Sequence, residues 1–156
     1  MAIWRIPITI EELNSGSTGT MVSHIGIEFL AVGEDYLKAR MPVDHRTIQP
    51  AGILHGGASV VLAETLGSVA AYLCEESGQK HCVGLEINAN HVRSVSAGFV
   101  YGIARPLHIG STTQLWDIRI SNELEQLVCI SRLTMAVLSS RPTSDKGNVG
   151  SVSKLT

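Results

Sequence analysis

The pattern of apolar residues divides the chain into one long helical segment and several short strand-like segments. Residues 57–76 are rich in Ala, Val and Leu, contain no Pro and precede Gly78, which predicts a helix of about five turns with a glycine near its exit. Apolar side chains lie on nearly all sides of this helix. We therefore expect it to be buried rather than to lie on the surface.

Shorter apolar runs on both sides of this helix predict β-strands. Residues 25–32 and 36–41 flank the turn residues 33–35, an arrangement typical of a β-hairpin. After the helix, four runs rich in Val, Ile, Thr and Leu are separated by short turns, so we expect a largely antiparallel sheet. The fold class is therefore α+β, with one long helix laid across a curved antiparallel sheet. The four runs are residues 82–94, 98–107, 113–121 and 126–138.

The two ends of the chain differ in pattern. Thr9 is followed three residues later by Glu12, the spacing of a capping box, which predicts a short helix over residues 10–15. Residues 140–156 are mainly Ser, Thr, Gly, Asn and Lys, a composition that predicts a flexible tail. We expect one folded domain over residues 1–139, followed by this tail.

Composition narrows the class of protein. The 156 residues suffice for one domain with its own core, and 44% of them are apolar against 17% charged. The formal net charge of −2 gives no broad basic surface, so we expect neither nucleic acid nor a membrane as partner. No run reaches the roughly 18 consecutive apolar residues of a spanning helix, and residues 1–10 lack a signal-peptide pattern, so we expect a cytoplasmic protein.

The cysteines are expected to be reduced thiols in the core. They are odd in number, have no CxxC spacing, and each lies in an apolar segment. A nucleophilic role for Cys82 beside His81 is not favoured, because neighbouring residues of a strand point to opposite faces. The three cysteines are Cys74, Cys82 and Cys129.

Glu64 lies in the middle of the predicted buried helix, where an unpaired carboxylate is costly. One interpretation is a structural carboxylate paired with Arg46, Arg93 or a serine. Another is a catalytic group, because Ser68 lies four residues later on the same helix face and can hydrogen-bond the carboxylate or a bound ligand. The sequence leaves both interpretations open.

The start of this helix carries the sequence His55-Gly56-Gly57. A helix start has unpaired N–H donors and a partial positive charge, which suits a carbonyl oxygen that becomes an oxyanion during attack. Glycines let such a group approach the backbone, and Gln49 and His55 lie where they can orient a water or an acyl group. With Glu64 as base or nucleophile, this combination indicates acyl transfer or hydrolysis.

Other catalytic arrangements find no support in the sequence. None of the histidines is spaced as HxxxH or paired with cysteine at zinc-finger spacing, so we expect no metal site. The GxSxG, GxGxxG and Walker motifs are missing, so neither a serine triad nor a bound dinucleotide or nucleoside triphosphate is expected. The histidines are His24, His45, His55, His81, His91 and His108.

Longer motifs go beyond these single residues. Residues 45–58 read HRTIQPAGILHGGA and residues 62–68 read LAETLGS. Together with residues 84–94 and 106–111, they resemble the hotdog-fold acyl-CoA thioesterases. Within that family they are similar to the branch of the 1,4-dihydroxy-2-naphthoyl-CoA hydrolase of menaquinone synthesis and the proofreading thioesterase of enterobactin synthesis. The resemblance implies hydrolysis of an aromatic acyl-CoA, such as a dihydroxynaphthoyl or hydroxybenzoyl thioester, by a homotetramer built as a dimer of dimers with active sites at the dimer interfaces.

The resemblance also implies roles for individual residues. Glu64 would be the catalytic carboxylate, the Gly56 amide would polarise the thioester carbonyl, and Gln49, His55 and Ser68 would position the acyl group and the water. The partner subunit could supply His55 and Gln49. Coenzyme A would be part of the substrate, so no separate cofactor is implied. The residues implied to hold coenzyme A are Gly84, His91, Val92, Arg93, Ser94, His108, Ile109, Gly110 and Ser111.

Two other functions remain open for a hotdog protein. One is a non-catalytic module that binds acyl-CoA, for which Arg93 would equally be the natural phosphate contact, with Arg105 near it. Glu64 and Ser68 argue against this function, since a pure binder gains nothing from a carboxylate that faces the thioester. The other is a hydratase or dehydratase of a 3-hydroxyacyl chain, in which the catalytic His and acid should have a different spacing.

Overall fold

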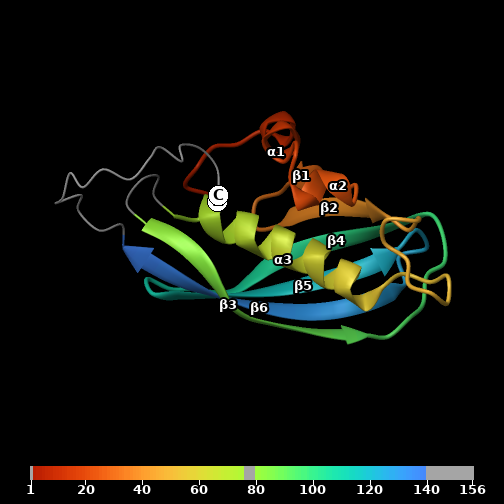
Figure 1. Cartoon of the computed structure of the whole chain (residues 1–156). Coiled ribbons are helices and arrows are strands. Elements are labelled where there is room, and N and C mark those ends of the chain that lie inside the picture. Colours follow the sequence, from red (N-terminus) through yellow and green to blue (C-terminus); the bar gives the residue numbers. More distant parts are fainter. Residues whose placement is uncertain (1, 76–79, 140–156) are drawn as a thin grey trace, which may run out of the picture.

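The computed structural model describes residues 2–75 and 80–139 of the chain. Residues 140–156, for which the sequence predicts a flexible tail, and the helix exit predicted at Gly78 lie outside these described residues. Figure 1 shows a long helix laid across a curved sheet, with two short helices beside it. The helices are α1 (Ile10–Gly16), α2 (Met21–His24) and α3 (Gly56–Leu73), and the strands are β1 (Glu28–Val32), β2 (Leu37–Pro42), β3 (Lys80–His91), β4 (Phe99–Ile109), β5 (Thr113–Asn122) and β6 (Leu127–Ser139).

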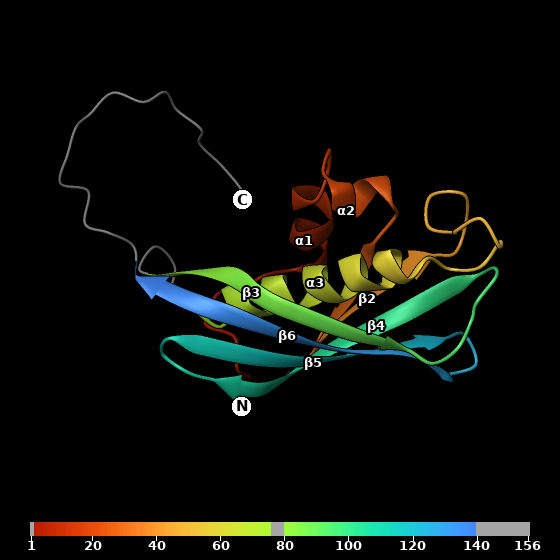
Figure 2. The ribbon, with the colours of Figure 1, turned by 60° about the horizontal axis from the view of Figure 1, so that its bottom comes forward.

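The strands form one antiparallel sheet in the order β1-β2-β4-β5-β6-β3. The predicted hairpin before α3 and the run from β4 to β6 follow the chain. Strand β3 instead pairs with β6 rather than with its successor β4, and places His91 opposite Cys129. Strand β3 is therefore one edge of the sheet, as Figure 2 shows, and β1 is the other.

Helix α3 contacts strands β2 to β6 and forms the core with them. Its own residues Leu62, Leu66 and Ala70 are fully buried. The expectation that α3 is buried on all sides is wrong, because Tyr72 is 50% exposed and Glu64, which lies beside the edge strand β3, is only half-buried. By length and hydropathy alone α3 could cross a membrane, but its contacts with the sheet identify it as the core helix of the fold.

The short helix α1 confirms the predicted capping box. Thr9 Oγ1 accepts a hydrogen bond from the Glu12 N–H at 3.2 Å, and the Glu12 carboxylate accepts one from the Thr9 N–H at 2.8 Å. Helix α2, which lies between α1 and β1, was not predicted. It has one turn and no side-chain cap at Thr20, so it is too short to produce a periodic pattern.

The described cysteines are free, and their positions agree with the expectation of reduced core thiols. Cys74 and Cys129 are buried and Cys82 is half-buried. Burial raises the pKa of the Cys74 thiol to about 12 and that of the Cys82 thiol to about 11, so both stay protonated near neutral pH. Protonated thiols are poor nucleophiles, which argues against cysteine catalysis.

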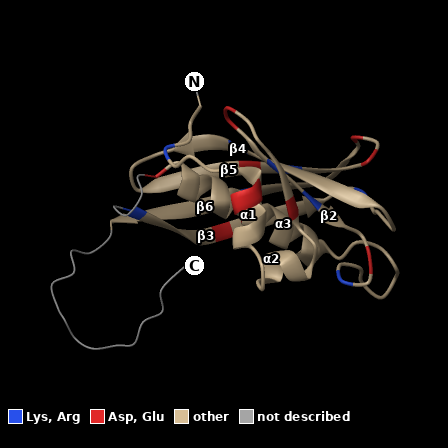
Figure 3. Cartoon of the chain, turned by 90° about the horizontal axis from the view of Figure 1, so that it is seen from above, with Lys and Arg blue, Asp and Glu red and all other residues tan. Residues whose placement is uncertain are grey.

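Charged residues are dispersed over the described chain. Figure 3 shows basic residues on separate strands and loops, with acidic residues between them. Several of them are paired across neighbouring positions, such as Arg40 with Glu28 at 2.7 Å and Arg119 with Asp117 at 3.0 Å. The sheet therefore presents mixed charge to solvent rather than one basic face.

Candidate active site

The imidazoles of His55 and His91 explain why positions 56 and 57, at the start of α3, are both glycine. His55 is the N-cap residue, and its Nδ1 atom accepts a hydrogen bond from the Gly57 N–H at 2.8 Å. A Cβ atom on Gly57 would lie 2.9 Å from that same nitrogen. A Cβ atom on Gly56 would lie 2.8 Å from Nε2 of His91, which reaches the helix from the end of β3. Both positions therefore exclude a side chain unless an imidazole moves.

The Gly56 N–H is free to receive a ligand. It is the first helical donor and has no acceptor among the described residues, whereas the next one, Gly57 N–H, is satisfied by His55. Because the N–H groups of a helix start carry partial positive charge, Gly56 offers a preformed site for a carbonyl oxygen or oxyanion. This agrees with the predicted role of its amide.

The loop that enters α3 is ordered by its own hydrogen bonds. The buried Thr47 hydroxyl donates to the Pro42 carbonyl at 2.7 Å, and the Thr47 carbonyl accepts from the His55 N–H at 2.8 Å. Nearby, the Arg46 guanidinium lowers the pKa of Asp44 to about 2 and pairs with it at 2.6 Å. These contacts hold the backbone just upstream of the helix start, where Gln49 and His55 lie.

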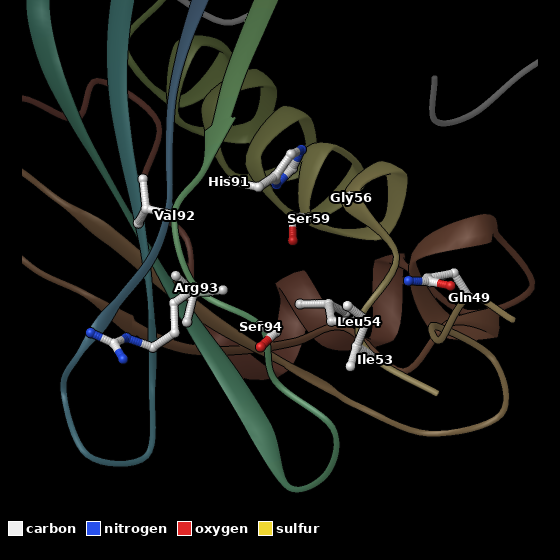
Figure 4. A pocket seen from close by; sticks show the side chains of 10 residues that line it. Gln49, Ile53, Leu54, Gly56, Ser59, His91, Val92, Arg93 and Ser94 are labelled. Atoms are coloured by element: carbon white, nitrogen blue, oxygen red, sulfur yellow. The ribbon is translucent and has the colours of Figure 1, made fainter. Parts of the chain in front are cut away.

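A cavity of about 440 Å³ opens beside the Gly56 amide. It brings together six of the predicted site residues from the loop, the helix start and the segment after β3, as Figure 4 shows. Its other walls are mainly apolar. The lining residues are Gln49, Ile53, Leu54, Gly56, Ser59, His91, Val92, Arg93, Ser94 and Val128.

Two side chains of the cavity are oriented in a way that bears on ligand binding. Gln49 Oε1 accepts a hydrogen bond from the Ala51 N–H at 2.6 Å, which leaves the side-chain NH₂ of Gln49 as a donor for a ligand. The guanidinium of Arg93 points away from the centre of the cavity (Figure 4). A phosphate bound by Arg93 would therefore lie outside the cavity rather than in it.

Glu64 and its neighbours form a second group, in the middle of α3. The Ser68 hydroxyl donates to Glu64 Oε1 at 3.3 Å, as the spacing predicted. A Cβ atom on Gly84 would lie 2.9 Å from the same carboxylate oxygen, and Gly84 stands at a register shift of β3. The carboxylate is half-buried, so the expectation of complete burial is wrong for the single chain. Glycine at position 84 therefore leaves room for the Glu64 carboxylate.

The segment from His108 to Ser111 forms a third group, at the turn between β4 and β5. Its residues Ile109, Gly110 and Ser111 line a smaller cavity of about 270 Å³ with Cys74, which follows the last residue of α3. This cavity lies at the opposite end of the helix from Gly56. Because α3 has 18 residues at about 1.5 Å per residue, the two ends are about 27 Å apart.

One chain therefore does not unite the predicted catalytic residues. Glu64 follows Gly56 by eight residues, which corresponds to about 12 Å along the helix axis. That separation is too large for one carboxylate and one amide to act on the same thioester carbon. Among the described residues, no three His, Cys, Asp or Glu side chains cluster closely enough to hold a metal ion.

Of the four cavity residues that the sequence did not point to, Ser59 is the one with a polar side chain. It is 1% exposed and stands one helical turn after Gly56. Its spacing of three residues from Gly56 would have placed it on the same helix face, which is the signal that could have found it. A small serine in an Ala-rich and Val-rich helix, however, is ordinarily an unremarkable core residue.

Comparison with known proteins identifies the class. A family model for the thioesterase superfamily matches residues 51–129. The chain is 58% identical over 136 residues to the 1,4-dihydroxy-2-naphthoyl-CoA hydrolase of Escherichia coli (strain K12), which covers 87% of this chain and 99% of that protein. It is 53% identical over 137 residues to the proofreading thioesterase EntH of Cronobacter turicensis, which covers 87% of this chain and 98% of that one.

Solved structures agree with the sequence matches. A Q49A mutant of thioesterase PA1618 from Pseudomonas aeruginosa superposes with a TM-score of 0.87 at 50% identity, covering 89% of this chain and all 100% of that one. Thioesterase HI1161 from Haemophilus influenzae gives a TM-score of 0.88 at 50% identity, covering 92% and 99%. The chain belongs to the thioesterase superfamily and has the hotdog fold. It is an enzyme, a thioesterase, and both the resemblance and the α+β prediction are confirmed.

Proposed function

We propose that this thioesterase hydrolyses an aromatic acyl-CoA to the free acid and coenzyme A, with 1,4-dihydroxy-2-naphthoyl-CoA or a hydroxybenzoyl-CoA as substrate. The observation that carries the proposal is the unpaired Gly56 N–H at the mouth of an apolar-walled cavity, a site suited to a thioester carbonyl beside an apolar acyl group. The name of the Escherichia coli relative supports the naphthoyl substrate, and a role in menaquinone synthesis follows from it.

In the proposed reaction, the carbonyl oxygen accepts a hydrogen bond from the Gly56 amide. Glu64 either removes a proton from a water that attacks the carbonyl carbon or attacks the carbon itself. With Glu64 as base, the water oxygen bonds to the carbonyl carbon, the C–S bond breaks, and the coenzyme A sulfur takes up the proton that Glu64 removed. With Glu64 as nucleophile, its oxygen bonds to the carbon as the C–S bond breaks; water then cleaves the resulting anhydride, which releases the acid and leaves on Glu64 a proton that passes to the coenzyme A sulfur. Ser68, at 3.3 Å from the Glu64 carboxylate, holds that carboxylate beside Gly84, where the missing side chain leaves room for it.

The active site in this proposal is completed by a second copy of the chain. Glu64 is a half-buried residue of α3 whose carboxylate lies beside Gly84 of β3, about 12 Å along the helix from its own Gly56. Strand β3 is an open sheet edge that exposes Val83 by 41% and Leu85 by 63%, an arrangement suited to pairing with another β3. We propose a dimer through this edge, with Glu64 of one protomer facing the Gly56, Gln49 and His55 of its partner, and a tetramer formed from two such dimers.

Coenzyme A enters as part of the substrate, so the proposal includes no separate cofactor. Its pantetheine arm and phosphates would lie along the segments 91–94 and 108–111, with the outward guanidinium of Arg93 on a phosphate. A cytoplasmic location is proposed with it, because free core thiols suit a reducing compartment. Hydrolysis is preferred to hydration or dehydration because the relatives that carry a specific name are a hydrolase and thioesterases.

The test is release of free thiol from dihydroxynaphthoyl-, benzoyl- and straight-chain acyl-CoA. We expect the aromatic thioesters to be hydrolysed fastest, and Glu64→Ala to lower kcat by about 10²- to 10⁴-fold, the usual effect of removing a general base. Glu11→Ala, which removes an exposed carboxylate from α1, is the matched control and should leave the rate unchanged. An undiminished rate for Glu64→Ala would reject the assignment of this carboxylate.

A further inference from the structure

The hydroxyl of Ser59 opens onto the cavity and has no protein partner among the described residues. Ser59 is 1% exposed, and Figure 4 shows its oxygen pointing from α3 into the cavity, between His91 and Leu54. Among the described residues no atom forms a hydrogen bond with this oxygen, and only the backbone N–H of Ser59 is paired, with the His55 carbonyl at 3.3 Å. A hydroxyl that faces a cavity without a protein partner is available to pair with a bound group.

The other buried polar side chains behave differently. The Thr47 hydroxyl donates to the Pro42 carbonyl at 2.7 Å, and the Ser131 hydroxyl donates to the Asn88 carbonyl at 2.6 Å. Gln114 and Glu75 bond each other at 2.7 Å. In the part of the chain that the structure describes, Ser59 is thus the exception among the buried polar residues: it lines the larger cavity, and its hydroxyl has no partner there, whereas Glu75, which lines the smaller one, is paired with Gln114.

The cavity around Ser59 suits an aromatic body with a polar substituent. Ile53, Leu54, Val92 and Val128 supply apolar walls, and a pocket of this kind uses its few polar groups to fix orientation. A serine hydroxyl both donates and accepts, so it pairs well with another hydroxyl. Since the Arg93 guanidinium points away from the cavity, the phosphates lie outside and the acyl group is the part that enters.

We propose that Ser59 determines acyl specificity by hydrogen-bonding a hydroxyl substituent on the aromatic ring of the substrate. The assignment rests on the proposed thioesterase function and deepens it, because it selects hydroxylated aromatic acyl groups over unsubstituted ones. In it, the thioester carbonyl lies at the Gly56 amide and the ring extends toward Ser59. A ring without a hydroxyl leaves the serine unpaired in the complex, which weakens its binding relative to the hydroxylated ring.

The test compares kcat/KM for benzoyl-CoA with kcat/KM for 2-, 3- and 4-hydroxybenzoyl-CoA. We expect the wild type to prefer at least one hydroxylated isomer, and Ser59→Ala to reduce that preference by about tenfold, the effect of one buried hydrogen bond. The loss should fall on the hydroxylated substrate, with benzoyl-CoA hydrolysed as well as before. The isomer most affected by Ser59→Ala identifies the ring position whose hydroxyl bonds Ser59.

Ser131→Ala is the matched control, because Ser131 is also 1% exposed but its hydroxyl has a partner. We expect Ser131→Ala to lower Tm and leave the substrate preference unchanged, and Ser59→Ala to keep or raise Tm while it changes the preference. If Ser59 had only a structural role, Ser59→Ala would lower Tm and leave the substrate preference unchanged.

Three outcomes would overturn the assignment. An unchanged preference in Ser59→Ala, with normal hydrolysis, rejects the role of Ser59 alone. An equal loss for all four substrates shows that Ser59 contacts the thioester or coenzyme A, not the ring. Failure of the wild type to hydrolyse any of the four rejects the specificity role for benzoyl substrates, and failure on dihydroxynaphthoyl-CoA as well rejects the proposed function.

Discussion

The side chain of Asn14 forms two hydrogen bonds with the backbone of Phe29. Asn14 Nδ2 donates to the Phe29 carbonyl at 3.1 Å, and Asn14 Oδ1 accepts from the Phe29 N–H at 2.8 Å. The amide thus pairs with β1 as a neighbouring strand would, and α1 covers that edge of the sheet. The opposite edge, β3, has no such cover among the described residues, so the sheet is open to further strand pairing there.

Asn14→Ala should lower the free energy of unfolding by about 1–3 kcal/mol, because it leaves a partly buried N–H and carbonyl of Phe29 unpaired. Chemical denaturation checks the value. Asn88→Ala is the control, since Asn88 is exposed and its amide bonds Glu86 on the surface, and it should change stability little. Equal stability of the two variants would contradict the role of Asn14.

Gly56→Ala should lower kcat/KM by about 10²-fold or more, because the added Cβ would lie 2.8 Å from His91 Nε2 and displace the groups that surround the amide donor. Steady-state kinetics with the preferred aromatic acyl-CoA measure this. Gly16→Ala is the control, as nothing lies within 4 Å of its Cβ position.

A double variant tests whether the loss of kcat/KM in Gly56→Ala comes from a steric clash with His91. In the double variant Gly56→Ala, His91→Ala, the imidazole is gone, so the added methyl group should cost less than it does in the presence of His91. Strictly additive losses in the four-variant cycle would mean that His91 and Gly56 act independently.

The proposed dimer predicts complementation between two inactive variants. If Glu64 of one protomer serves the Gln49 of the other, mixed dimers of Glu64→Ala and Gln49→Ala contain one site with both residues intact. Co-expression with different affinity tags, followed by purification of the mixed species, should recover thiol release that neither variant shows alone. Mixed dimers that stay inactive would place both residues of each site on the same chain.

The pair Asp44–Arg46 predicts a dependence of stability on acid. Arg46 lowers the pKa of Asp44 from 3.8 to about 2, so the folded state favours the ionised carboxyl and the pair stabilises the protein above pH 4. This contribution should fade as the pH falls from 4 toward 2, because the carboxyl then takes up its proton. Measured as Tm, the difference between wild type and Asp44→Asn should be largest above pH 4, be much reduced at pH 2 and vanish below it. A difference that persists unchanged at pH 2 would contradict the pairing.

Local patterns determined most of the secondary structure. The capping box of Thr9 and Glu12 and the apolar run of α3 involve residues within a few positions of one another, so the sequence contains the whole interaction. The same holds for the strands, whose period-two burial is plain at β5, where Trp116, Ile118 and Ile120 are fully buried. Helix α2 escaped prediction because one turn has no period.

The sequence also supplied candidates for the site, since Gly56, Glu64 and Ser68 could be selected by type and spacing. Only the tertiary structure decided which of them meet. His91, for example, reaches Gly56 from the end of a strand that pairs with the last strand of the sheet, and the Glu64 carboxylate lies beside Gly84 of that same strand. Such contacts depend on how distant segments pack, and no local pattern carries that information.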